Sequence, residues 1–193
     1  AEQLEQKTLH QRAIKAWRGL TSKDQKKWRR YAEGVAAHRP PYGDGNSISG
    51  YNLFVSAYHG FAQLGNEHVP VPKKFEPFPI FSLDFISAEM VSLFDVQLRF
   101  KLTLCGTSKY NRYRVLGKIQ IEEPGVGRHP GRQRNYLSES VPDGASSEIE
   151  FVVPMNRNDL EMFQIHSRYL LLDTVTGHRS QYNGVSAIGS LAY

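Results

Sequence analysis

A run of cationic side chains occupies the segment from Arg128 to Arg134, RHPGRQR. Arg128, Arg132 and Arg134 fall within seven positions, together with His129. A guanidinium group presents several N–H donors in one plane and binds phosphate, sulfate or carboxylate groups through paired hydrogen bonds. The run therefore predicts a contact for an anion or a carboxylate-rich partner, and the alternative interpretation is a solubilising hairpin tip.

A second cationic cluster surrounds Trp28 and consists of Lys26, Lys27, Arg29 and Arg30. Cations at this density could follow a phosphate backbone. The segment WRGLTSKDQKKWRRYA also resembles the last helix of a high-mobility-group box. However, that family places its aromatic first helix before such a segment, whereas SGYNLFVSAY follows it here. Nucleic-acid binding is therefore kept as the alternative function.

Net charge is uneven along the chain. Residues 1–65 hold ten Lys and Arg against five Asp and Glu, whereas the remainder holds fourteen of each, so the whole net charge of +5 lies in the first third. Such asymmetry is a hint of an anionic partner. A surplus this small also fits a solvated helix surface, and the aromatic residues of the region fall at core spacing, where they cannot stack on bases.

The sequence contains no recognisable catalytic, metal or cofactor motif. The seven histidines form neither an H-x-x-x-H pair nor an HExxH motif, and His166 is expected on the outward face of a strand. Cys105, the single cysteine, has no His nearby in the sequence and is interpreted as a bystander thiol. Glu122 and Glu123 point to opposite faces of a strand and are expected to be solvated. We therefore expect a non-enzymatic protein without a cofactor.

Helical periodicity marks the first third. Leu9, Ala13, Trp17 and Leu20 share one face of a first helix. Ser22 is the expected N-cap of a second helix, with Gln25 at the capping-box spacing. The apolar face of this second helix consists of Trp28, Tyr31, Ala32 and Val35.

A proline- and glycine-rich loop, residues 38–47, precedes a third helix. Ser47 or Ser49 could cap that helix, and Gly65 fits the position just past its end. Its apolar face joins Trp17 and Trp28 in one predicted aromatic core that includes Tyr51 and Phe54. Residues 66–80 then space four prolines and predict a stiff, extended strap.

Beyond the strap the apolar period changes to two. Clear alternation over 96–104, 113–121, 149–153 and 163–171 predicts half-buried strands, and weaker candidates lie at 81–87, 135–141 and 185–191. Short strands at this spacing are typical of an immunoglobulin-like or fibronectin-like sandwich. The predicted fold class is α+β, with a basic three-helix region at 1–65, the strap at 66–80 and a seven-stranded antiparallel β-sandwich at 81–193.

The segments AWRGLTSKDQKKWRRYA and SGYNLFVSAYHGF, with the strap that follows, resemble a group of small uncharacterised bacterial and phage-associated proteins. In that group a W-x-x-L-[ST] helix hairpin precedes an S-G-Y-N-x-F helix and then a β-sandwich. The resemblance covers about residues 9 to 72 and implies a structural or interaction role in a phage particle or prophage remnant. The long loop at 38–47 departs from the group's pattern.

These observations predict a structural or protein-interaction module. We expect its partners to be proteins or further copies of the chain, with nucleic acid as the alternative and no membrane association, since no apolar run is long enough to span a bilayer. A cytoplasmic or virion-associated location is expected. The chain begins without Met, so a secreted protein whose signal peptide had been removed would look the same.

Overall fold

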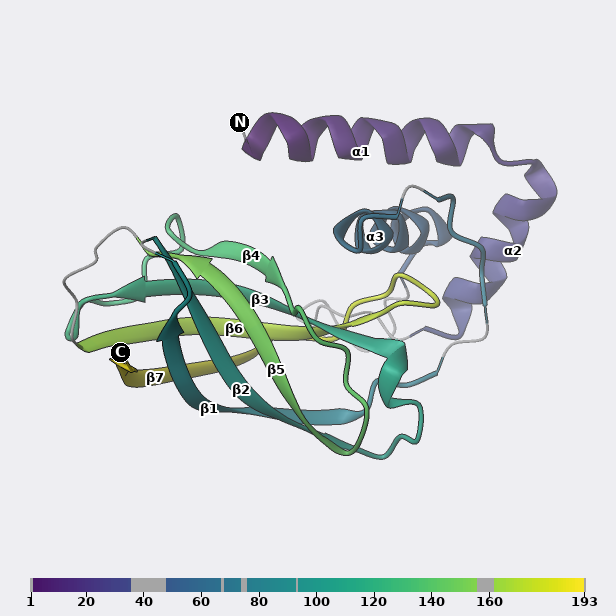
Figure 1. The fold of residues 1–193 in the computed structure, drawn as a ribbon. Helices are drawn as coiled ribbons and strands as arrows, with labels where there is room; N and C mark the ends of the chain where they lie inside the picture. Colours follow the sequence, from purple (N-terminus) through teal and green to yellow (C-terminus); the bar gives the residue numbers. More distant parts are fainter. Residues whose placement is uncertain are drawn as a thin grey trace. The chain divides into compact units, whose positions relative to one another are not determined.

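The computed structural model describes residues 2–35, 48–66, 68–73, 76–92, 94–155 and 162–192. The predicted loop at 38–47 and the alternative cap Ser47 lie outside the described residues. The chain forms two compact units (Figure 1). One unit comprises Ala1–Pro77 with Leu172–Ser180, and the other comprises Phe78–Leu171 with Gln181–Tyr193. Residues 172–180, which the sequence pattern placed in the sandwich, therefore group with the helices.

The helical unit contains α1 (Glu2–Gly19), α2 (Ser22–Glu33) and α3 (Gly50–Gln63), as the periodicity predicted. The expected cap of α2 was wrong by one residue. Thr21 is the N-cap, and its hydroxyl oxygen accepts a hydrogen bond from the Asp24 amide at 3.2 Å. Ser22 begins the helix instead, because Asp24 lies three residues after Thr21 and its carboxylate also accepts from the Thr21 hydroxyl at 2.7 Å. The Gln25 side chain donates to the Trp17 carbonyl at 3.1 Å and takes no part in the cap.

The third helix begins and ends as expected. The Ser49 hydroxyl oxygen accepts from the Asn52 amide at 3.1 Å. Gly65 follows the C-cap Leu64 with φ of +75°, in the left-handed region where a glycine costs least.

The predicted aromatic core of the three helices is confirmed. Trp28 and Phe54 are almost fully buried, and their rings meet edge to face with centroids 5.4 Å apart. The Trp17 ring lies 5.3 Å from Phe54 and 5.7 Å from Tyr51. Edge-on contacts of this kind add to the hydrophobic gain from burial, so these rings fix how the three helices pack.

A tight loop at 172–180 completes the helical unit. The Asp173 carboxylate accepts from the Val175 amide at 2.9 Å and from the Thr176 hydroxyl at 2.8 Å, which fixes the turn. Gly177 has φ of +71°. The buried His178 ring stacks on Tyr31 of α2 with centroids 5.8 Å apart. These contacts explain why a segment between two strands belongs to the helical unit.

The described part of the second unit contains seven named strands, of which β6 ends in the helical unit, and each strand segment expected from the alternation lies at least partly within one of them. They are β1 (Ile80–Met90), β2 (Asp95–Cys105), β3 (Tyr113–Glu122), β4 (Arg134–Leu137), β5 (Ser146–Pro154), β6 (Met162–Asp173) and β7 (Asn183–Ala192). The strand predicted at 135–141 ends at Leu137, since the chain turns there toward β5. A short 3-10 helix, Tyr110–Arg112, precedes β3.

The strand order is β4-β3-β6-β7-β1-β2-β5. The β1–β2, β2–β5, β3–β4 and β6–β7 pairs are antiparallel, as expected. The expectation of a wholly antiparallel sheet is wrong at one place, because β7 pairs with β1 in parallel at Ala88 and Glu89. Such a pair arises because no tight hairpin connects these two strands, which leaves their relative direction unconstrained.

The core of the β-unit lies between strands that are distant in this order. Figure 1 shows β1, β2 and β5 crossing in front of β3, β6 and β7. The Phe100 ring of β2 lies 5.3 Å from the Tyr169 ring of β6, and Phe151 of β5 lies 5.9 Å from the same ring. All three side chains are fully buried. The chain is thus an α+β protein with a sheet-rich C-terminal part.

Candidate functional site

A groove of about 810 Å³ opens at one end of the β-unit. It lies where β3 ends, β4 begins and β5 ends. Its apolar lining comes from Ile119, Ile121, Tyr136, Val153 and Met155, and its charged lining from Glu122, Glu123, Arg132 and Arg134. An apolar floor with a few charged groups is the usual composition of a binding site.

The two walls of this groove are the outermost strands of the sheet order, β4 and β5. They are joined at one point, where the Glu139 amide donates to the Glu150 carbonyl at 2.9 Å. Ser140 adds a side-chain hydrogen bond to the Glu148 carbonyl at 3.2 Å. β4 and β5 stand at opposite ends of the strand order, so in the described part of the chain they are not ladder neighbours, and the groove separates two strand edges.

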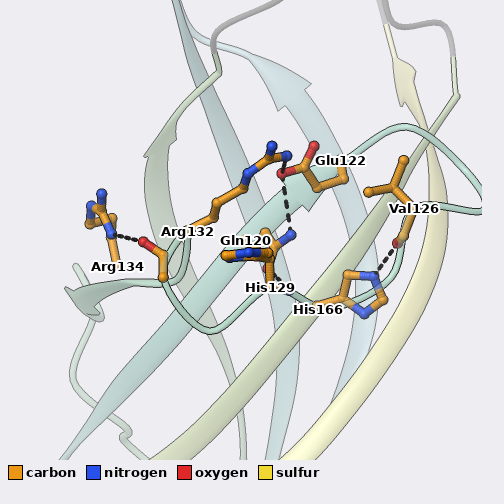
Figure 2. A network of polar contacts seen from close by, with 8 residues as sticks. Gln120, Glu122, Val126, His129, Arg132, Arg134 and His166 are labelled. Atoms are coloured by element: carbon orange, nitrogen blue, oxygen red, sulfur yellow. Dashed lines mark hydrogen bonds and ion pairs between the residues drawn. The ribbon is translucent and has the colours of Figure 1, made fainter.

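The mouth of the groove carries an ion pair. Arg132 Nη1 lies 2.9 Å from Glu122 Oε1, and the Gln120 side-chain amide donates to the same oxygen at 3.2 Å (Figure 2). The hydrogen bond from Arg132 lowers the pKa of Glu122, against the opposing effect of partial burial. Glu122 was expected to be solvated. It is paired instead, because the loop after β3 brings Arg132 back over the strand.

The loop between β3 and β4 is fastened to the outer surface of the sheet. Gln120 accepts from the His129 amide at 2.9 Å, and Gln164 accepts from the Gly125 amide at 3.2 Å. His166 Nε2 lies 2.8 Å from the Val126 carbonyl oxygen, as Figure 2 shows. The expectation of a surface His166 was wrong. Its side chain points away from the core, but this loop covers it and leaves it 7% exposed.

The structure brings two of the three predicted arginines of this loop to the groove. Arg132 and Arg134 line it, and Arg134 Nη1 also donates to the Gly131 carbonyl at 2.8 Å, which holds the base of the loop. Arg128 is exposed and is not among the lining residues. The loop is fastened at several points while Arg128 and Arg132 stay exposed, so the predicted anion or partner contact and the alternative of a solubilising tip both remain predictions.

The cations of the helical unit lie on α2. Lys26, Lys27, Arg29 and Arg30 are exposed, and Lys27 Nζ lies 2.8 Å from Asp24 Oδ1. Trp28, which they surround in the sequence, is only 1% exposed and cannot stack on a base. The cluster is thus a charged helix face without an accessible aromatic platform of its own.

The sequence missed three residues that build the site, namely Gln120, Gln164 and His166. Strict alternation assigns their side chains to the outer face of the strands, and solvent is the default neighbour of that face. These three side chains are covered only because the loop between β3 and β4 folds back over the outer face of the sheet. The glycines and prolines of EPGVGRHPG, which let a chain fold back, were the available signal.

Other candidate groups remain apart. Cys105 is an exposed free thiol at the end of β2. Among the described residues no group of three or more His, Cys, Asp or Glu side chains could hold a metal ion. Nor is any described helix both long and apolar enough to cross a membrane.

Comparisons with known proteins give little further information. No protein-family model matches the chain, and neither does any curated protein. β-Glucosidase 3B from Thermotoga neapolitana, solved with glucose, is similar over 69% of this chain, with 14% identity and a TM-score of 0.27. The match covers only 20% of that chain. A collagen-binding domain from a Staphylococcus aureus adhesin matches over 61% of this chain and 99% of its own, with 9% identity and a TM-score of 0.23. TM-scores this low support no conclusion.

Proposed function

We propose that this chain is a non-enzymatic protein-interaction module that holds a partner polypeptide in the groove between β4 and β5. The observation that carries the proposal is the combination of two strand edges, an apolar floor and two arginines in one groove of about 810 Å³. Side chains at the same end support it. Phe94, whose carbonyl accepts from the Met155 amide at 2.6 Å, is 64% exposed. Contiguous exposed apolar surface marks interaction sites, and the Phe94 ring would extend the apolar lining of the groove beside Met155.

We further propose that the β-unit is a sandwich of the immunoglobulin or fibronectin kind. The rings of β2 and β5 that face Tyr169 of β6 favour this architecture over a single open sheet. Modules of that kind bind partners through loops and strand edges at one end. A role in a phage or prophage-derived particle would suit such a module, and other copies of the chain or other particle components would then be its partners.

Selection of binders from a displayed library of random peptides would test the groove. We expect peptides enriched on the wild-type chain to lose binding to Tyr136→Glu and Arg134→Glu, which change the lining. The control Ile80→Glu alters a side chain that is 80% exposed and absent from the groove lining, so it should keep binding. Thermal melts must show that all variants fold. Enrichment that survives both groove substitutions would contradict the proposal.

Nucleic-acid binding by α2 is the second candidate, and the exposed Lys26, Arg29 and Arg30 favour it. Binding through phosphate contacts weakens steeply as salt rises, because counterions are released. A gel-shift series with random DNA at low and physiological salt would test this function. Tight, salt-sensitive binding that is lost when Lys26, Lys27, Arg29 and Arg30 are replaced by Gln would favour it over the groove.

A further inference from the structure

Hydrogen bonds on either side of β5 reveal which of its backbone groups face the groove. The Ala145 carbonyl accepts from the Leu104 amide at 2.8 Å, and the Met155 amide donates to the Phe94 carbonyl at 2.6 Å. Odd-numbered residues of β5 therefore direct their backbone groups toward β2. The Glu150 carbonyl accepts from Glu139 on the other side. Because successive residues alternate, Val152 and Pro154 direct theirs away from β2, toward the side of β5 on which the groove opens. Pro154 lines the groove, and Val152 directly precedes the lining residue Val153.

The same reasoning applies to β4. The Ser138 amide donates to the Val115 carbonyl at 2.8 Å, so even-numbered residues face β3. The Glu139 amide faces β5, and by alternation Leu137 and Asn135 also turn their backbone groups away from β3. Continued from the Glu139–Glu150 bond, an antiparallel register would place Leu137 opposite Val152. The structure does not continue it, and the groove opens there instead.

We propose that a partner binds here by strand addition. An extended segment would lie along the edge of β5, with the edge of β4 on its other side. Main-chain hydrogen bonds to Val152 would fix which residue of the segment lies opposite Val152. Alternate side chains of the segment would then point to opposite faces of the added strand. This inference rests on the proposed function, because it assigns a binding mode to the same groove.

The groove also defines the chemistry of the segment. On one face the lining is apolar. Ile121 and Tyr136 are partly exposed there, whereas Ile119, Val153 and Met155 are at most 4% exposed and belong to the core. The apolar surface that Ile121 and Tyr136 offer suits Val, Ile or Phe side chains. At the rim, Arg132 and Arg134 lie with Glu122 and Glu123, so the charged lining carries no net charge. The Arg132 side chain nevertheless stays 60% exposed beside Glu122, and its exposed guanidinium is the group that a partner carboxylate would meet. We therefore infer an extended segment with apolar residues at alternate positions and a carboxylate between them.

A peptide that copies residues 147–154, SEIEFVVP, has this composition and is the probe. Its titration into the full chain, followed by fluorescence anisotropy, should show saturable binding. Methylation of alternate amide nitrogens of the peptide removes the donors on one edge while keeping every side chain. We expect the methylated series to include a peptide that binds about tenfold more weakly, since a tenfold loss corresponds to about 1.4 kcal/mol, which is within the net contribution of one main-chain hydrogen bond.

On the protein side, Val152→Pro removes the backbone amide of residue 152, which points away from β2. The hydrogen bonds between β5 and β2 stay intact, because a proline is tolerated in an edge strand where its nitrogen faces away from the neighbouring strand. The matched control Val152→Thr keeps the amide, and the Val152 side chain is already partly exposed. Peptide binding should fall about tenfold in Val152→Pro and stay unchanged in Val152→Thr. Should Val152→Pro not fold, the methylated peptides alone decide the question.

Two outcomes would overturn the inference. Absence of binding at peptide concentrations on the order of 1 mM would exclude this class of segment. Equal binding of methylated and unmethylated peptides would mean that side chains alone hold the partner. If the methylated and unmethylated peptides bind equally but library peptides still require Tyr136 and Arg134, the chain would be a groove-binding module that does not use strand addition. Failure of both the library and the probe would remove the two together.

Discussion

Gly60 of α3 packs directly against the backbone of Gly177, in the loop that follows β6. A Cβ atom on Gly60 would overlap the Gly177 carbonyl oxygen and approach the Leu172 side chain to 3.1 Å. Backbone cannot move aside as a flexible side chain can. The absence of a side chain at Gly60 is therefore what lets residues 172–180 join the helical unit.

Gly60→Ala should destabilise the helical unit by about 1–3 kcal/mol, because the added methyl group forces the loop and the helix apart. Gly19→Ala is the matched control. A Cβ there meets nothing within 4 Å, so this change should be neutral or slightly stabilising. Denaturant unfolding followed by tryptophan fluorescence reports on the helical unit, since both tryptophans lie in it. Equal midpoints for the two variants would refute the close contact.

Trp28→Ala should cost about 3 to 5 kcal/mol, because it removes a buried ring that contacts Phe54 and Tyr31. Leu4→Ala provides a comparison on α1, where the leucine is 69% exposed, and should change stability by less than about 0.5 kcal/mol. Calorimetry or chemical unfolding measures both. A neutral Trp28→Ala would mean that the ring is available for binding.

Acidification should weaken the helical unit through His59. Burial, with the positive charges of Arg179 and His10, lowers the pKa of this side chain below its ordinary 6.5. The unfolded chain then takes up a proton more readily than the folded chain. The free energy of unfolding should therefore fall as the pH drops through 6.5 and level off once the folded ring is protonated.

The dependence on His59 can be measured from unfolding midpoints between pH 8 and pH 5. The variant His59→Gln cannot take up this proton, so its midpoint should vary less over that range. Identical pH profiles for the two proteins would assign the effect to other groups.

The ion pair between Glu122 and Arg132 should respond to acid at a lower pH than His59 does. The pKa of Glu122 lies below its ordinary 4.5, so the carboxylate stabilises the folded loop above that pH, and the contribution is lost as pH falls through the lowered value. The expected loss is small, about 0.2–1 kcal/mol, since Arg132 is largely exposed. In NMR spectra, the backbone amide shifts of residues 131–134 should move with this titration. In Glu122→Gln the same shifts should already lie near their acidic positions at neutral pH.

Much of the architecture follows from local patterns. Trp28, Phe54 and the alternation of β2 were predictable, because burial on one face of a helix or strand imposes a period on the sequence. The cap of α2 was missed by one residue, since Thr21 and Ser22 are both good caps, each with a polar residue three positions on, and the structure pairs Thr21 with Asp24 instead of Ser22 with Gln25.

The candidate site was less predictable. The arginines were visible in the sequence, but their partner Glu122 and the covering of Gln120 and His166 depend on a loop that contains several glycines and prolines. The groove itself depends on where β4 and β5 part, which is a property of strands distant in sequence. No local period encodes such a relationship.

The loop at 172–180 also bears on the order in which the protein can fold as it is made. The three helices are complete once residue 63 has been synthesised, but the segment that covers Gly60 follows roughly a hundred residues later. At about 5–20 residues per second, a ribosome needs on the order of ten seconds for that stretch. During this interval the helices lack the segment that packs against Gly60. The helical unit can therefore be completed only after β6 and residues 172–180 have been synthesised.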